Sequence, residues 1–226
     1  MPVYNKSYLT KDAILNIYDV CKDIDYELLV MDDWSTDDTV SVVAKIYTDN
    51  IKYYKFQENV WVTEAWNQWV KYSEWEYICV INNDVIFPQG FFQKLMSGLD
   101  DVWMVNPRFS EWSIEQPSDV MYFKNHVCWH CYMFKWKDKD IIFPLPEELR
   151  IFGSDNWLWF HLTDIGLKQK VKHDAICHHL KSQTSFFIPN KDRPIFFNLA
   201  AKNGWKIEAV YPLPTDDLKE DFIFSC

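Results

Sequence analysis

The stretch YELLVMDDWSTDD, residues 26–38, joins a short apolar run to a cluster of acidic and hydroxyl side chains. Its first part, Tyr26–Met31, has the length and composition of a buried parallel strand and stops at Asp32 and Asp33. The residues after it, Thr36–Tyr47, open with helix-capping side chains and continue as a predicted helix. A buried strand that passes through a polar turn into a helix is the repeating unit of α/β proteins.

The same alternation continues on both sides of this stretch. Hydrophobic spacing predicts helices at Lys11–Cys21, at Val62–Tyr72 and from Pro88 onward, and strands at Ile51–Phe56 and Glu76–Ile81. Strands that alternate with helices indicate a mostly parallel central sheet flanked by helices. The fold class predicted for the chain is therefore α/β.

Polar residues gather where strand-like runs of the first half end. Tyr4-Asn5, Asp32-Asp33 and Asn82–Asp84 each follow such a run. In open α/β sheets, ligands bind beyond the carboxyl ends of the strands. The three clusters are thus predicted to converge on one edge of the sheet and to form a site.

The second half of the chain has a different pattern. Asp101–Arg108 and Val120–Trp136 resemble strands with long connections, which predicts a small mixed or antiparallel part. Gly153–Leu162 has helical spacing, and Leu167–Cys177 leads to the pair His178-His179. No internal repeat or low-complexity linker separates the halves, so a single fused unit is predicted.

Charge and composition argue against several classes of partner. The 226 residues carry a net charge of −10, which disfavours nucleic acid or an anionic membrane as the main partner. No apolar run reaches membrane-spanning length, and the first residues, MPVYNKSYL, do not resemble a signal peptide. The six cysteines are scattered along the chain, so we expect reduced thiols and a cytoplasmic location.

Short motifs follow one another in the order of a known family. The series is PVYN at residues 2–5, MDDWSTD at 31–37, NVWVTEAWN at 59–67, INNDV at 81–85, GSDNW at 153–157 and AICHHLKSQT at 175–184. Up to about residue 185 the chain therefore resembles the large inverting family, family two, of GT-A glycosyltransferases. The resemblance implies one GT-A domain over residues 1–226, with a nucleotide-sugar-binding half (1–108), an acceptor and catalytic half (109–190) and a C-terminal extension (191–226).

The resemblance also implies a reaction and a donor site. The expected activity is inverting transfer of a sugar from a UDP- or dTDP-sugar to a glycan hydroxyl. The residues expected to bind the nucleotide sugar are Pro2, Val3, Tyr4, Asn5, Asp33, Asn67, Asn82 and Asn83. Asp33 would accept a hydrogen bond from a uracil or thymine N–H, whereas Asp32, Asp37 and Asp38 are predicted to be turn and capping carboxylates.

The chemistry requires a cation and a base. The departing diphosphate needs Mn²⁺ or Mg²⁺, and Asp84, at the end of a buried strand, is the expected ligand. Neighbouring side chains on a strand face opposite ways, so only one of His178 and His179 can face the metal, and the motif register favours His178. Asp155 is the predicted base for the acceptor hydroxyl. A helix-capping role for Asp155 and a simple turn role for Asn82–Asp84 are the alternatives.

Several positions depart from the family pattern. The glycines usual in the family are replaced by Trp34, Trp61, Trp69 and Trp75. Because Gly often serves where φ is positive, we expect altered loop geometry near the nucleotide base. The first family strand is almost absent before Pro2, so two alternatives are open: the gene starts late, or the chain is one module of a longer protein.

Two other interpretations remain open from the sequence. Cys128 and Cys131 form a C-x-x-C motif near His126, which would suit a zinc site or a redox dithiol. In an alternating strand, however, these two cysteines face opposite sides. A non-catalytic nucleotide-sugar or glycan-binding module is the other possibility, because of the missing glycines and Ser154 in place of the usual acidic residue.

Overall fold

The computed structural model describes residues 1–100, 102–109, 130–151, 153–180 and 192–205. Within these ranges strands and helices alternate through the first half, as the sequence predicts. The strands are β1 (Pro2–Val3), β2 (Leu28–Asp32), β3 (Ile51–Lys55), β4 (Tyr77–Ile81), β5 (Val85–Ile86), β6 (Met104–Phe109), β7 (Cys131–Lys135) and β8 (Gln169–His179). The α-helices are α1 (Ser7–Val20), α2 (Thr39–Lys45), α3 (Trp61–Tyr72), α4 (Phe91–Met96), α5 (Lys139–Ile142), α6 (Ser154–Asp164) and α7 (Arg193–Lys202).

The strands form two sheets. One has the order β1-β2-β3, and both of its pairings are parallel. The other has the order β4-β7-β6-β8-β5, in which β6 and β8 are parallel and the other three pairings are antiparallel. The predicted α/β class is confirmed, and the antiparallel part is larger than the small one expected.

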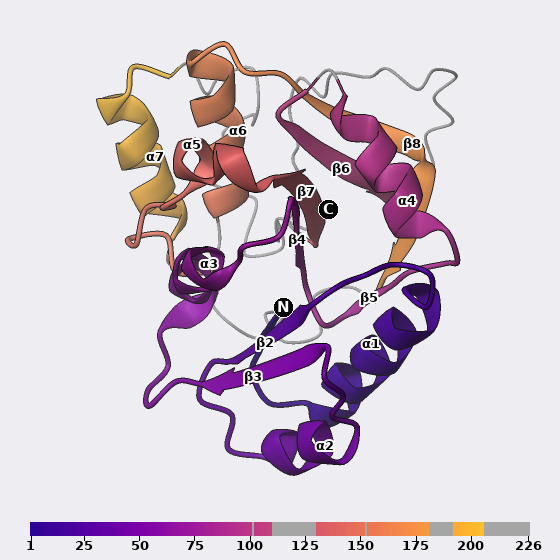
Figure 1. Cartoon of the computed structure of the whole chain (residues 1–226). Coiled ribbons are helices and arrows are strands. Elements are labelled where there is room, and N and C mark those ends of the chain that lie inside the picture. Colours follow the sequence, from indigo (N-terminus) through magenta and orange to yellow (C-terminus); the bar gives the residue numbers. More distant parts are fainter. Residues whose placement is uncertain (101, 110–129, 152, 181–191, 206–226) are drawn as a thin grey trace.

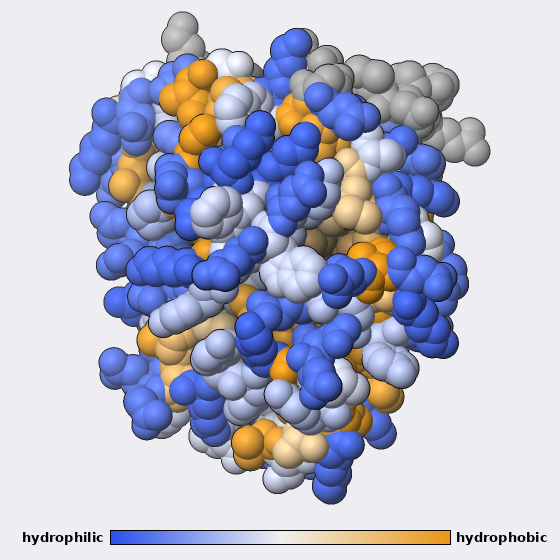
Figure 2. Space-filling model, viewed as in Figure 1, coloured by the Kyte–Doolittle hydropathy of each residue, from blue (hydrophilic) through white to orange (hydrophobic). Residues whose placement is uncertain are grey.

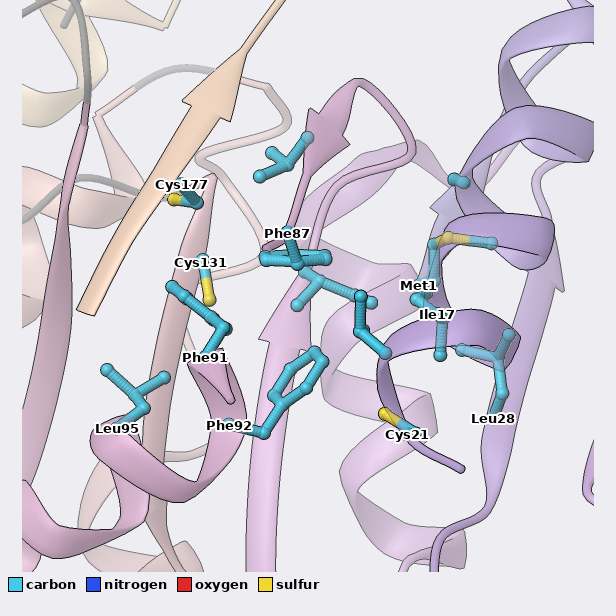
Figure 3. Close-up of a cluster of buried hydrophobic side chains, with 14 of the residues drawn as sticks. Met1, Ile17, Cys21, Leu28, Phe87, Phe91, Phe92, Leu95, Cys131 and Cys177 are labelled. Carbon is cyan, nitrogen blue, oxygen red and sulfur yellow. The ribbon is translucent and has the colours of Figure 1, made fainter. Parts of the chain in front are cut away.

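Helices cover both faces of the strands (Figure 1). Alternate residues of one strand point to opposite faces. Leu28 and Val30 of β2 therefore pack in one hydrophobic cluster with α1 and α4, while Leu29 and Met31 pack in another with α3 and α6. Figure 3 shows the first cluster, where the aromatic rings of Phe87 and its neighbours in α4 meet residues of α1. The double-sided burial explains why β2 is a continuous apolar run.

Several element boundaries differ from the prediction. Helix α1 starts at Ser7 rather than at Lys11, because the carboxylate of Asp37 accepts a hydrogen bond from the Ser7 backbone N–H at 2.9 Å. Helix α7 was not predicted; its Phe196 packs on Phe160 of α6. The predicted strand residues 120–129 lie outside the described ranges, and β7 forms the remainder.

A cavity of about 270 Å³ is lined by residues from both sheets. Residues early in β2 and β4, among them Leu28 and Ile78, line it together with Met1. The amino group of Met1 donates a hydrogen bond to the Leu29 carbonyl oxygen at 2.8 Å. The cavity thus opens near the amino ends of these strands, away from the polar clusters that follow their carboxyl ends.

The outer surface is mostly hydrophilic on the face that Figure 2 shows. Hydrophilic side chains cover most of the face in Figure 2, and hydrophobic residues occur there in small separate groups. Among the described helices, none combines the length and the apolar character needed to cross a bilayer.

Candidate active site

Asp84 lies in the tight turn between β4 and β5 and is only 6% exposed. Its Oδ2 atom is 3.3 Å from Nε2 of His179, the last residue of β8. Its backbone carbonyl accepts a hydrogen bond from the Leu180 N–H at 2.8 Å. The antiparallel pairing of β5 with β8, in which Val85 faces His179, brings the two side chains together.

The structure therefore places His179, rather than the predicted His178, beside Asp84. His179 is buried and His178 is exposed, because successive residues of β8 point to opposite faces. The sequence predicted that only one of the two could face this site, and the structure has the neighbouring position beside Asp84, which differs by a single step of strand register.

His130, just before β7, completes this cluster. Its ring stacks on the His179 ring with centroids 3.4 Å apart and an interplanar angle of 15°. Its carbonyl accepts a hydrogen bond from the Asn82 N–H at 3.0 Å, and its Nδ1 lies 3.4 Å from the Asn82 Nδ2. Burial, followed by the neighbouring His179, lowers the pKa of His130 to about 3, so its ring is neutral. The motif analysis did not include His130 in the site.

The residues of this cluster fit a divalent cation. Asn82 Oδ1 is buried and has no hydrogen-bond partner among the described residues, so it points to a ligand. Asp84 and His179 could supply one oxygen and one nitrogen ligand, and these two atoms already lie side by side. In the described part of the chain, no three His, Cys, Asp or Glu side chains are grouped to hold a metal. Mg²⁺ needs only one or two carboxylates when phosphate and water supply the remaining ligands.

The carboxylates at the end of β2 accept hydrogen bonds from neighbouring groups. Asp32 is completely buried, and it accepts hydrogen bonds from the Ser35 N–H at 2.6 Å and from the Tyr53 hydroxyl. Asp33 accepts one from the Val60 N–H, at the start of α3, at 2.6 Å. Burial raises the pKa of Asp33 to about 6, although the N–H groups of Val60 and Trp61 counteract this. Asp32 has the predicted loop role, and Asp33 joins β2 to α3.

The first predicted motif also holds the loop after β2. The Asn5 side-chain oxygen accepts a hydrogen bond from the Thr36 N–H at 2.8 Å, and the Asn5 N–H donates to Ser35 Oγ at 2.8 Å. Val3 is buried, and its carbonyl accepts from the Asp33 N–H at 2.8 Å. Pro2 and Tyr4 on either side are half-buried. These contacts give the motif a framework role next to Asp33.

Two of the predicted donor-binding amides make hydrogen bonds within the framework. Asn67 donates from Nδ2 to the Leu145 carbonyl at 2.9 Å and accepts from the Leu145 N–H at 2.8 Å. Asn83 donates to the Thr10 hydroxyl of α1 at 3.1 Å. Both side chains are buried and held by these contacts, and their role in donor binding stays a prediction.

The start of α6 lies against the start of α3. Ser154 Oγ is 2.7 Å from Thr63 Oγ1, and the Thr63 N–H donates to the Arg150 carbonyl at 3.2 Å. Asp155 is the second residue of α6, and its side chain lies outside what the structure describes. Because Asp33 binds the N-terminus of α3, the two helix starts bring the region of Asp155 toward the end of β2.

The cysteine hypothesis finds no support at Cys131. This residue is fully buried in β7, and Cys79 Sγ is 3.7 Å from its sulfur. Burial raises the pKa of the Cys131 thiol well above its usual range, which disfavours the thiolate needed for metal binding or redox exchange. Cys128 and His126 lie outside the described ranges.

Solved glycosyltransferases share this fold. A Pyrobaculum calidifontis mannosyltransferase, PcManGT, in complex with GDP-Man and Mn²⁺, has 19% identity and a TM-score of 0.63, covering 79% of this chain and 55% of that one. GalNAc-T7 with UDP, GalNAc and Mn²⁺ has 10% identity and a TM-score of 0.67, covering 88% and 46%. S. aureus TarS with UDP-GlcNAc has 18% identity and a TM-score of 0.61, covering 78% and 56%. The protein therefore has the GT-A glycosyltransferase fold.

The family follows from the sequence match. The model described as "Glycosyl transferase family 2" matches residues 1–133, which is more than half of the chain. The chain belongs to glycosyl transferase family 2, as its motifs predict. No curated protein sequence matches it significantly. The chain spans about half the length of the three solved structures.

Proposed function

We propose that this chain is a metal-dependent, inverting glycosyltransferase that moves a sugar from a nucleoside-diphosphate sugar to a hydroxyl group of a glycan. The observation that carries the proposal is the cluster at the end of β4. There Asp84 meets His179, and the buried oxygen of Asn82 has no partner among the described residues. Family membership and the nucleotides bound to the related structures support the same activity.

Asp84 and His179 would hold the divalent cation, Mn²⁺ or Mg²⁺. When bound, this cation offsets the charge that develops on the departing diphosphate. The neutral His130 ring packs flat on His179 and so keeps the imidazole aligned with Asp84. The Asn82 Oδ1 atom is available to accept a hydrogen bond from the donor ribose or from a bound water.

Asp33 and Asp155 have separate roles in this proposal. Asp33 uses Oδ1 for α3 and would accept a base N–H with its carboxylate, which favours a UDP- or dTDP-sugar. Asp155, in the first turn of α6, would take the proton of the acceptor hydroxyl on the side of the sugar opposite the diphosphate. Attack from that side inverts the anomeric configuration.

The test is release of nucleoside diphosphate from a panel of UDP-, dTDP- and GDP-sugars with Mn²⁺. We expect turnover with at least one donor, and a loss of roughly 100-fold or more in the Asp84→Asn variant. The matched control is Asp49→Asn, which removes an exposed carboxylate away from the cluster and should retain full turnover. Tight nucleotide-sugar binding without turnover in the unmodified chain would instead identify a binding module.

A further inference from the structure

Two tryptophans adopt a backbone conformation that normally favours glycine. Trp34 has φ 68° and Trp61 has φ 69°. A bulky residue with positive φ is a genuine outlier, because its Cβ approaches the following carbonyl. The family pattern has Gly at both positions, and the structure shows that the left-handed backbone is kept while the side chain is large.

The strained positions are concentrated in one place. The only other described non-Gly residues with positive φ are Asn5 and Lys6, which follow β1. Asn5 tolerates this conformation well, and its side chain holds the Thr36 N–H. Strain of this kind collects at functional sites when the side chain contributes something that a relaxed residue would not.

Both tryptophans flank one hydrogen bond. The Val60 N–H donates to Asp33, so Trp34 and Trp61 each come immediately after a partner of this bond. Trp34 is 46% exposed, at the carboxyl end of β2. Trp61 is half-buried, and the Arg150 guanidinium lies 5.6 Å from the centroid of its ring. Core packing therefore does not account for the Trp34 ring.

We propose that Trp34 and Trp61 are binding residues that stack on the planar base of the nucleotide, beside the Asp33 carboxylate. This inference rests on the proposed function. An indole ring offers a flat apolar face that stacks on any base, while Asp33 supplies a hydrogen-bond acceptor at the base edge. A glycine would relieve the backbone strain but would provide no such face. The two tryptophans thus lower the stability of the fold and raise its affinity for the nucleotide.

The test compares two substitutions at position 34 in the full chain. Trp34→Gly removes the ring and the strain, whereas Trp34→Ala removes the ring but keeps a Cβ at positive φ. Both should weaken binding of UDP or GDP with Mn²⁺ about tenfold, measured by calorimetry. Only Trp34→Gly should also raise the urea midpoint of unfolding. Trp61→Gly, like Trp34→Gly, should weaken nucleotide binding and raise the urea midpoint.

The control is Trp75→Gly, because Trp75 is 37% exposed and precedes the amino end of β4. It should leave nucleotide affinity unchanged. If the unmodified chain binds UDP or GDP and Trp34→Gly binds it equally tightly, the stacking role is wrong while the proposed function stands. A Trp34→Gly variant that unfolds at lower urea would also overturn the role, because it would make Trp34 a structural residue. The same comparison is made with dTDP, and if the unmodified chain binds none of the three nucleotides, both proposals fail together.

Discussion

The ends of β2 and β4 look alike in the sequence but differ in how their polar atoms are used. After β2, both oxygens of Asp32 accept hydrogen bonds, and the Asn5 oxygen holds the same loop. After β4, the Asn82 oxygen is buried without a partner among the described residues, and Asp84 faces His179. The first cluster is complete as folded, whereas we propose that the second is completed by a ligand. At these two strand ends, the satisfaction of buried polar atoms distinguishes the clusters better than residue type does.

Each cluster also contains an exception. Asn83, after β4, is tied to Thr10 and belongs to the framework. Asp33, after β2, is buried with a raised pKa, which shows that its charge is poorly compensated. Each cluster therefore contains both structural residues and candidate binding residues, and single substitutions can tell them apart.

The largest expected effect is loss of stability at Asp32. Asp32→Ala would leave the buried Ser35 N–H and the Tyr53 hydroxyl without their acceptor. We expect the free energy of unfolding to fall by about 3 kcal/mol, since each unsatisfied buried group costs roughly 1–3 kcal/mol. Urea denaturation followed by circular dichroism measures this.

The matched variant is Asp84→Ala. The Asp84 contact with His179, at 3.3 Å, is longer than the 2.6 Å hydrogen bond of Asp32 to the Ser35 N–H, so its removal in metal-free buffer should lower the free energy of unfolding by less than the removal of Asp32 does. Equal losses for Asp32→Ala and Asp84→Ala would show that both strand ends are framework, and the contrast between them would disappear.

An intermediate effect is expected at Asn67. Its amide makes two hydrogen bonds to the Leu145 backbone, so Asn67→Ala leaves a buried N–H and a buried carbonyl unpaired. We expect a loss of about 2 kcal/mol in the free energy of unfolding. Asn82→Ala should leave stability unchanged or raise it, because it deletes a buried oxygen that lacks a partner. A thermal shift assay on both variants ranks them, and the reverse order would contradict the assignment.

The sequence predicted the parts of the molecule that depend on local pattern. Strand and helix periodicity located β2, α3 and β4 to within a few residues, and the position of Asp84 after a buried strand pointed to the cluster that we propose as the site. It could not find His130, because only the antiparallel pairing of β7 with β4 brings this residue to Asn82.

Other contacts of the predicted site residues could not be read from the sequence for the same physical reason. The choice between His178 and His179 depends on strand register, where one residue reverses the direction of every side chain. Asn67 was expected to bind the donor, yet its partner Leu145 is 78 residues away in the chain. Contacts between distant backbone groups leave no periodic signal, so long-range framework roles are hidden from sequence analysis.

The smallest expected effect is a pH dependence caused by Asp33. Because its pKa is raised from 3.8 to about 6 by burial, the folded chain binds the proton more tightly than the unfolded chain does. The stability that this proton contributes is complete below pH 4 and is lost as the pH rises through 6. Asp33→Asn keeps an oxygen for the Val60 N–H and carries no charge, so it should remove this slope.

Urea midpoints at pH 4, 5, 6 and 7 for the unmodified chain and for Asp33→Asn measure the difference between the two slopes. Other carboxylates contribute equally to both proteins, so the difference isolates Asp33. If Asp33 also accepts the base N–H, UDP affinity should fall below pH 6 in the unmodified chain, because the protonated carboxyl is a poorer acceptor. Asp33→Asn should bind UDP weakly at every pH. If Asp33→Asn keeps both the pH dependence of stability and the affinity for UDP, Asp33 has only a structural role, like Asp32. The whole cluster after β2 would then be structural, and only the cluster after β4 would contain binding residues.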